Sequence, residues 1–182
     1  MNKIFMLLLC LGMYGTAVYV TANNEVSPYE ETYPEIGYKT VEEALNDLEM
    51  HYQKKLKLPL RVPPIAFTHH FGRFSNLNGD INDSFEVIFI SNQLSENHYK
   101  INVRPVKYKI PIKDKYVIRT LELKSGEEAI YMTISGFNEL VFEKDEWQYM
   151  LGIDKRISDP VTPEVLVDIA NSIEYTIPNS TK

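Results

Sequence analysis

This chain has almost no cysteine: its 182 residues contain a single one, Cys10. That residue lies in an apolar N-terminal segment, so the sequence beyond residue 22 contains no thiol. The body of the protein therefore has no disulfide, no cysteine nucleophile and no thiolate ligand for a metal. It must be held together by the burial of an apolar core.

Sequence motifs of enzymes and nucleotide-binding proteins are also missing. There is no G-x-G-x-x-G loop, no Walker loop and no serine in a G-x-S-x-G turn. The histidines never show the i, i+4 spacing of a zinc protease, and the adjacent pair among them would point to opposite faces of a strand. They are His51, His69, His70 and His98. We therefore predict no catalytic, metal-binding or cofactor-binding residue, no cofactor and no enzymatic activity; the residues of a binding site stay unknown.

Two polar groups resemble ligand sets without matching them. Oxygen-bearing side chains stand at nearly every second position of residues 76–83, as in a calcium loop. The glycine, Gly79, is in the wrong place, and no glutamate stands at the twelfth position. The carboxylates Glu143, Asp145 and Glu146 cluster where we expect a hairpin turn. We interpret the first group as a turn-rich loop and the second as a soluble surface.

Clustered positive charge is scarce as well. The net charge is −6 and the isoelectric point is about 5.3. The longest basic clusters, residues 54–57 and 107–115, are interrupted by apolar side chains, and we interpret both as solvated faces. Because nonspecific binding to nucleic acid needs clustered lysine and arginine, we expect no nucleic-acid partner.

Residues 1–22 have the pattern of a signal peptide or an N-terminal membrane anchor. Residues 4–20 are almost wholly apolar, and small residues precede Asn23 as signal peptidase requires. Three outcomes stay open: cleavage after Ala22, retention as an anchor that contacts the membrane through residues 4–20, or lipidation at Cys10. Each outcome predicts an extracytoplasmic protein, either secreted or held at the outer face of the cytoplasmic membrane.

The remaining sequence divides into a linker, one domain and a short tail. Residues 23–39 are acidic, contain two prolines and show no period, so we predict a flexible linker. The composition, 44% apolar with 12 tyrosines, is sufficient for one folded domain, which we place at residues 40–176, with a tail at 177–182. Thr40 and Glu43 form a capping box before an apolar stripe, which predicts a helix over 40–56.

Alternating apolar residues follow this helix in several runs. Strand-like runs lie at 65–74, 85–90, 98–104 and 116–124, and three more within 127–153. A second helix is predicted over 162–173, because Thr162 can cap it and Pro163 suits the first helical position. We predict the α+β class: an antiparallel β-sheet of about six strands with an N-terminal and a C-terminal helix packed on it.

These features resemble those of an uncharacterised bacterial extracytoplasmic domain family, seen in lipoproteins and at the C-terminus of some anti-sigma-factor-like proteins. The resemblance covers about Thr40 to Tyr175 and is carried by residues 58–64, the paired runs 85–90 and 98–104, and the block 126–173. Phe142 stands where the family usually has a tryptophan or another aromatic residue. The resemblance implies an α+β fold and a non-enzymatic role, and it brings no functional residues to this chain.

We therefore expect a non-catalytic cell-envelope protein that binds a peptide, a lipid or a partner protein, or acts as a sensor. Two alternatives stay open: an envelope hydrolase with a noncanonical site, and a structural or sporulation-associated envelope component. An open groove lined by aromatic side chains would favour binding, whereas converging histidines and carboxylates would favour an enzyme. The sequence leaves the ligand, the partner, the oligomeric state and the biological process open.

Overall fold

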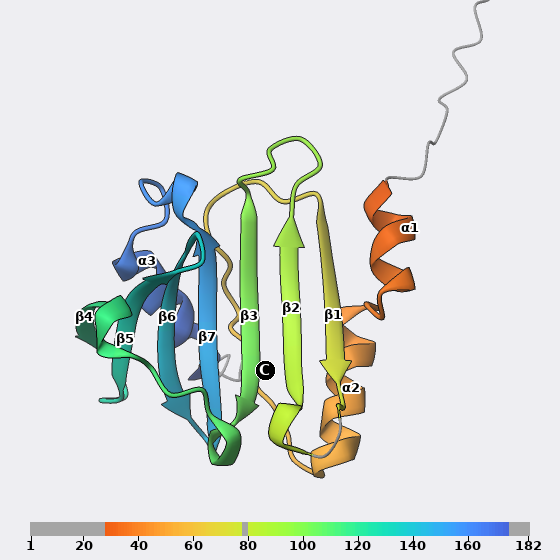
Figure 1. Cartoon of the computed structure of the whole chain (residues 1–182), viewed down its shortest axis with the longest axis horizontal. Coiled ribbons are helices and arrows are strands. Elements are labelled where there is room, and N and C mark those ends of the chain that lie inside the picture. Colours follow the sequence, from red (N-terminus) through yellow and green to blue (C-terminus); the bar gives the residue numbers. More distant parts are fainter. Residues whose placement is uncertain (1–27, 78–79, 175–182) are drawn as a thin grey trace, which may run out of the picture.

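The computed structural model describes residues 28–77 and 80–174, and a seven-stranded antiparallel sheet is its main feature (Figure 1). The strand order is β1-β2-β3-β7-β6-β5-β4. Two meanders, β1 to β3 and β4 to β7, are joined where β3 pairs with β7. The strands are β1 (His69–Ser75), β2 (Ser84–Ile90), β3 (His98–Pro105), β4 (Val117–Glu122), β5 (Glu128–Ile134), β6 (Phe137–Lys144) and β7 (Trp147–Asp154).

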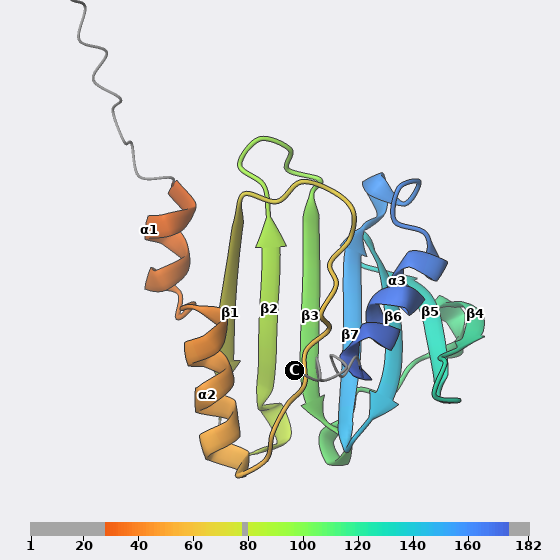
Figure 2. The same ribbon diagram turned by 180° about the vertical axis from the view of Figure 1, so that it is seen from behind.

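Helices and an extended segment cover one face of the sheet. Figure 2 shows α2 (Val41–Tyr52) against β1, α3 (Pro163–Ala170) over β6 and β7, and residues 53–68 running between them. The largest fully buried side chains of this layer include Tyr99, Tyr149 and Phe85. Because alternate residues of every strand point to this side, the core lies between the sheet and the helices.

The close approach of α2 to β1 depends on Gly72. A Cβ atom at this position would lie 2.8 Å from Cα of Val41 and 2.9 Å from Cβ of Ala44, so a side chain does not fit. The predicted capping box begins this helix, since the Thr40 hydroxyl accepts from the Glu43 amide and the Glu43 carboxylate accepts from the Thr40 amide. The helix ends at residue 52 because Gln53 takes a left-handed conformation with φ of 52°.

Residues 53–68 cross the covered face without forming a strand or helix. Side chains satisfy their backbone groups: Tyr149 donates to the Lys57 carbonyl at 2.9 Å, and Ser172 accepts from the Leu60 amide at 3.0 Å. Leu56 is buried, and other apolar side chains of the segment pack against the core. The first strand therefore begins at residue 69, four residues later than we predicted from alternation.

A short helix, α1 (Pro28–Glu35), lies within the segment that we predicted as a linker. Its tyrosines contact the β1 strand at the edge of the sheet: the Tyr33 ring stacks on Phe71 with centroids 4.9 Å apart, and Tyr29 meets His69 edge-on at 5.6 Å. Lys39 then forms a β-bridge with Gly72. This part of the expected linker is therefore structured, because its tyrosine rings pack on β1. Its acidic, aperiodic sequence does not predict these contacts.

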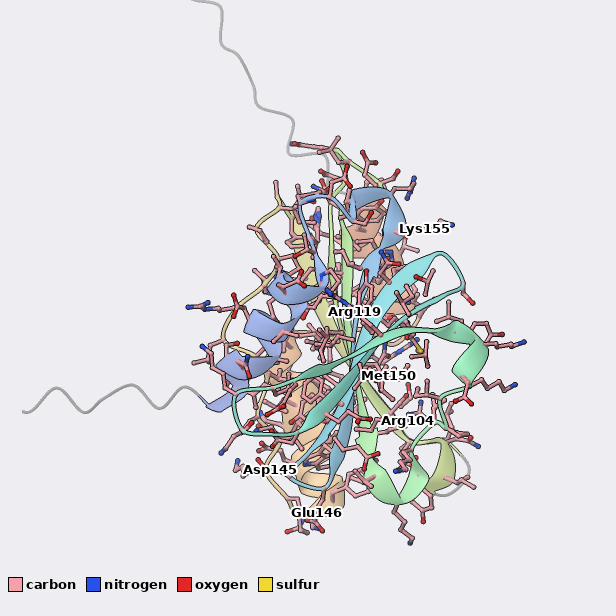
Figure 3. The ribbon with its side chains drawn as sticks, turned by 90° about the vertical axis from the view of Figure 1, so that its left-hand side faces the viewer. Arg104, Arg119, Asp145, Glu146, Met150 and Lys155 are labelled. Carbon is pink, nitrogen blue, oxygen red and sulfur yellow. The ribbon has the colours of Figure 1, made fainter. Side chains whose placement is uncertain are left out.

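Neither α2 nor α3 lies on the opposite face of the sheet, which we call the open face; the α1 tyrosines contact it at the β1 edge. Residues 106–116 cross it between β3 and β4, as Figure 1 shows. Figure 3, which views the sheet from its β4 edge, places this crossing segment and α3 on opposite sides. The Gln148 amide fastens the segment to β7: its Oε1 accepts from the Ile110 amide at 2.8 Å, and its Nε2 donates to the Ile110 carbonyl at 2.9 Å.

Short 3₁₀ turns complete the chain. They are η1 (Asp80–Asn82), η2 (Val106–Tyr108), η3 (Asp114–Tyr116), η4 (Lys155–Ile157) and η5 (Asn171–Glu174). The α+β class with an antiparallel sheet is confirmed, whereas the sheet has seven strands and not six. The predicted helices 40–56 and 162–173 are shorter, at 41–52 and 163–170, and α1 is an additional helix.

The predicted signal segment, residues 1–22, and the predicted tail, residues 177–182, lie outside the described residues. Across the described ranges 28–77 and 80–174, no helix is both long and apolar enough to cross a membrane.

Candidate functional site

The open face holds a row of residues that the strand register brings side by side. Lys100 of β3 lies opposite Gly152 of β7, which in turn lies opposite Glu139 of β6. Ile88 and Met132 continue this row on either side. One cationic side chain and one carboxyl therefore flank a residue that has no side chain.

A hollow of about 470 Å³ lies over this part of the open face, and we call it the open-face pocket. Residues of β3, β5, β6 and β7 form its floor, and the crossing segment, residues 106–116, forms its wall. The volume is typical of sites for small molecules, which are mostly apolar with a few polar groups. Its lining residues are Lys100, Ile110, Pro111, Ile112, Lys113, Tyr116, Met132, Ile134, Ser135, Phe137, Glu139 and Met150.

Gly152 keeps the middle of the row empty. A Cβ atom built there would lie 3.4 Å from Cγ of Glu139 and 3.8 Å from the Phe137 ring. Such distances are ordinary van der Waals contacts, so the Glu139 side chain packs directly beside the bare backbone of residue 152.

Glu139 is the unusual polar group of the site. Only 8% of the residue is exposed, and its Oε2 atom has no hydrogen-bond partner among the described residues. Burial raises the pKa of this carboxyl, and the positive charge of Lys100 opposes the rise. A buried carboxyl without a donor destabilises the fold, so a role in binding is a reasonable explanation for its position.

Lys100 contributes the positive charge of the pocket floor. Its Nζ lies 3.8 Å from the centroid of the Phe137 ring, which is a cation–π contact. It forms no ion pair with any carboxylate in the described part of the chain. Both charged groups of the row are therefore placed beside the pocket without neutralising each other directly.

The crossing segment forms the apolar wall of the pocket. The paired hydrogen bonds from Gln148 hold Ile110 over β7, and Gln148 itself is only 2% exposed. Met150 and Arg104, which are labelled in Figure 3, belong to the neighbouring strands β7 and β3. The Gln148 side chain therefore makes the two hydrogen bonds that a neighbouring strand would make, and it positions residues 106–116, which form no strand.

A larger hollow of about 740 Å³ lies at the end of the sheet beside the turn from β6 to β7. Trp147 and Tyr52 line it, and their ring centroids are 5.5 Å apart. Its charged groups pair with one another: Lys54 bonds Glu146 at 2.6 Å, and Lys144 bonds Glu127 at 3.0 Å. Oε2 of Glu127 has no partner in the described residues, but that side chain is 30% exposed. The open-face pocket is therefore the stronger candidate.

The predicted turn-rich loop contains a buried carboxylate, Asp83, which is one of the oxygen-bearing side chains that resemble a calcium loop in the sequence. Asp83 is fully buried, and its Oδ2 lies 3.0 Å from both Nε2 of His51 and the hydroxyl of Tyr52. Its Oδ1 accepts from the Leu77 amide at 3.2 Å. Because contacts within the protein use both oxygens, this carboxylate fastens α2 to the loop before β2. Over residues 28–77 and 80–174, no group of three or more His, Cys, Asp or Glu side chains could hold a metal ion.

The other histidines do not converge. His69 and His70 take opposite faces of β1, as predicted, since one faces the Ile90 row and the other the Phe89 row. His98 lies edge-on to the Phe137 ring at 5.3 Å, and burial lowers the pKa of its imidazole. The histidines therefore make no common site in the part of the chain that the structure describes. The carboxylates Glu143, Asp145 and Glu146 lie exposed around the β6–β7 turn, as predicted.

Comparison with protein-family models, with curated proteins and with solved structures gives no match for this chain. The resemblance to the envelope domain family thus stays a prediction. The site itself was missed by the sequence analysis, although one signal was present. Glu139 stands between the apolar residues Phe137 and Val141 on one face of the strand run 137–144.

Proposed function

We propose that this protein is a non-catalytic, extracytoplasmic protein of the cell envelope that binds a small, largely apolar ligand in the open-face pocket. The observation that carries the proposal is Glu139, a buried carboxyl with an oxygen that no described residue bonds, placed at the edge of an apolar hollow. The export-like segment 1–22 motivates the location, and the resemblance to envelope domains implies a non-enzymatic role.

An enzymatic alternative has one observation in its favour, the contacts of His51 and Tyr52 with buried Asp83. A histidine oriented by a carboxylate is the usual arrangement of a general base. Tyr52 also lines the larger hollow. However, Asp83 already accepts a backbone amide, which is typical of a structural clamp, so we favour the binding role.

Ligand analysis of the purified full-length chain tests the proposal. Met150→Trp should fill the pocket, whereas Ile118→Trp adds the same ring at a residue on β4 that is 57% exposed. We expect native mass spectrometry of the wild type and Ile118→Trp, isolated from the producing cell's envelope, to show a bound small molecule that Met150→Trp lacks. Circular dichroism checks that both variants fold.

Two results would contradict the proposal. A bare wild-type protein would exclude a tightly held small ligand. A ligand retained by folded Met150→Trp would place binding elsewhere in the chain. In that case, substitution of Tyr52 and Trp147 would test the larger hollow next.

A further inference from the structure

We infer that the ligand of the open-face pocket is a carboxylate with a hydrocarbon chain, bound with its head group between Lys100 and Glu139. This inference rests on the proposed binding function and goes further, because it assigns the charge and the size of the ligand. The argument uses the hydrogen-bonding capacity of the floor, the charge of the lining and the apolar character of the walls.

The polar groups of the floor call for a ligand that accepts hydrogen bonds. A lysine ammonium has three donors and no acceptor, and a protonated carboxyl adds one O–H donor. Lys100 and protonated Glu139 would therefore present donors from both sides of Gly152. A carboxylate offers acceptors only, and it would satisfy the carboxyl oxygen that the described residues leave without a partner.

The charges of the lining favour an anion. Two lysines, Lys100 and Lys113, line the pocket against the single carboxyl of Glu139. Because burial raises the pKa of Glu139, its neutral form persists to higher pH than that of an exposed glutamate. A cationic head group would approach two lysines, and a zwitterion would require Glu139 to be ionised in a buried site.

The remaining walls are suited to a hydrocarbon chain. Aliphatic and thioether side chains surround the hollow on the sheet and on the crossing segment: Ile110, Ile112, Met132, Ile134 and Met150. A water molecule occupies about 30 Å³ in the liquid, so a hollow of about 470 Å³ takes on the order of 15 atoms of that size. A saturated carboxylate of about ten to twelve carbon atoms fits this limit.

Calorimetric titration of the full-length chain with three probes of equal chain length tests the inference. The probes are decanoate, 1-decanol and decyltrimethylammonium, each below its micelle concentration. We expect decanoate to bind about ten- to a hundredfold more tightly than decanol, since charge-assisted hydrogen bonds add that much. The quaternary ammonium should bind more weakly than decanol. Met150→Trp should lose the binding of decanoate. Because this variant keeps the apolar residues 4–20, it also shows whether decanoate binds to that segment and not to the pocket.

Two substitutions separate the head-group contacts from the walls. Lys100→Met keeps the length of the side chain without its charge, and it should weaken decanoate about tenfold or more while leaving decanol nearly unchanged. Glu139→Gln keeps a donor without a titrating proton. Wild-type affinity for decanoate should therefore fall as pH rises through the raised pKa of Glu139, and the affinity of Glu139→Gln should stay flat.

The pH effect is assigned to Glu139 by its surroundings. Its titratable neighbours in the pocket are Lys100 from β3, and Lys113 and Tyr116 from the crossing segment. Gly152 and Met132, opposite it on β7 and β5, do not titrate. His98 and Asp154 lie on the same face nearer the far end of β7, and Asp154 is held by Arg156 at 2.6 Å. A His98→Gln variant should therefore keep the pH dependence of the wild type.

The outcomes distinguish this inference from the proposed function. If decanol or the ammonium binds as tightly as decanoate, and Met150→Trp blocks it, the pocket binds ligands but the assignment of an anion is overturned. If decanoate binds equally to the wild type, Met150→Trp and Lys100→Met, it binds elsewhere, and the assignment of a carboxylate to the pocket is overturned. Absence of binding by all three probes overturns the inference and leaves the proposed function to the mass-spectrometric test.

Discussion

At the scale of single residues, two buried carboxyl groups have opposite environments. Asp83 accepts hydrogen bonds through both oxygens and connects α2 to the loop before β2. Glu139 lies under an apolar wall, with one oxygen that no described residue bonds. Buried polar groups in native proteins are almost always bonded, so the first is typical of a structural contact and the second is the basis of the proposed binding role. The two predictions at this scale follow from this contrast.

Glu139→Gln should stabilise the ligand-free protein at neutral pH. Burial raises the pKa of Glu139 in the fold above its unfolded value, so the stability associated with the protonated form is present at low pH and decreases as pH rises through the folded pKa. Urea unfolding at pH 7.5 should show a higher free energy for the variant, and the difference should vanish near pH 4. An equal difference at both pH values would show that ionisation of Glu139 is not the cause.

Asp83→Ala should destabilise the protein by about 2–4 kcal/mol, because it leaves the hydroxyl of Tyr52 and the Leu77 amide without their buried acceptor. The free energy of unfolding in urea measures the loss. Asp159→Ala, at an exposed aspartate, is the matched control and should change stability by less than about 0.5 kcal/mol. Similar free energies of unfolding for both variants would show that Asp83 does not stabilise the fold.

At the scale of elements, the crossing segment is the part that makes the pocket. It has two 3₁₀ turns and no strand, so only side-chain contacts hold it on the sheet. Gln148 supplies both a donor and an acceptor to Ile110 and so replaces one step of a β-ladder. The basic cluster 107–115, which we interpreted from the sequence as a solvated face, includes this apolar wall.

Gln148→Leu should release the segment and lower stability by about 1–2 kcal/mol, since two hydrogen bonds are lost. The exchange of the Ile110 amide hydrogen with solvent should become at least about tenfold faster, which corresponds to a loss of about 1.4 kcal/mol of protection. Lys109→Ala is the control within the same segment. It removes an ion pair with Glu143 whose two side chains are almost half exposed, and such pairs contribute little. Unchanged exchange at Ile110 in Gln148→Leu would contradict the tether.

At the scale of the whole molecule, the sheet has two different faces and a protected β1 edge. Helices α2 and α3 and residues 53–68 cover one face, as Figure 2 shows. The open face is covered in part, by the crossing segment on one side and by the α1 tyrosines on the other. Exposed edges of sheets invite pairing with other chains, and the Lys39–Gly72 bridge occupies part of the β1 edge.

Tyr33→Ala should loosen this N-terminal covering. The ring packs against Phe71 at 4.9 Å, Tyr38 at 5.1 Å and Tyr29 at 5.7 Å, and aromatic pairs contribute about 0.5–1.5 kcal/mol each. We expect a loss of about 1–3 kcal/mol in urea unfolding and faster exchange of the Gly72 amide, which donates to the Lys39 carbonyl. Thr32→Ala, on the exposed side of α1, should leave both nearly unchanged. Equal exchange at Gly72 in the two variants would show that α1 does not protect the edge.

The sequence by itself determined the elements whose signals are local. The capping box at Thr40 and the alternation of 137–154 predicted α2, β6 and β7, because side-chain periodicity and terminal hydrogen bonds depend only on near neighbours. Helix α1 was missed because its stability comes from rings on another element. The start of β1 was predicted too early for a similar reason: the backbone groups of residues 53–68 bond side chains that are distant in the sequence and not a neighbouring strand.

Only the tertiary structure decided the site. Lys100, Glu139 and Gly152 come from three strands, and they become neighbours because the two meanders join at the pairing of β3 with β7. The sequence of neither meander predicts this pairing, because either edge strand of each meander could pair with the other meander. The choice depends on the burial of one face by α2, α3 and the extended segment. Register then places a lysine and a carboxyl on either side of a glycine, on the face that the helices leave open.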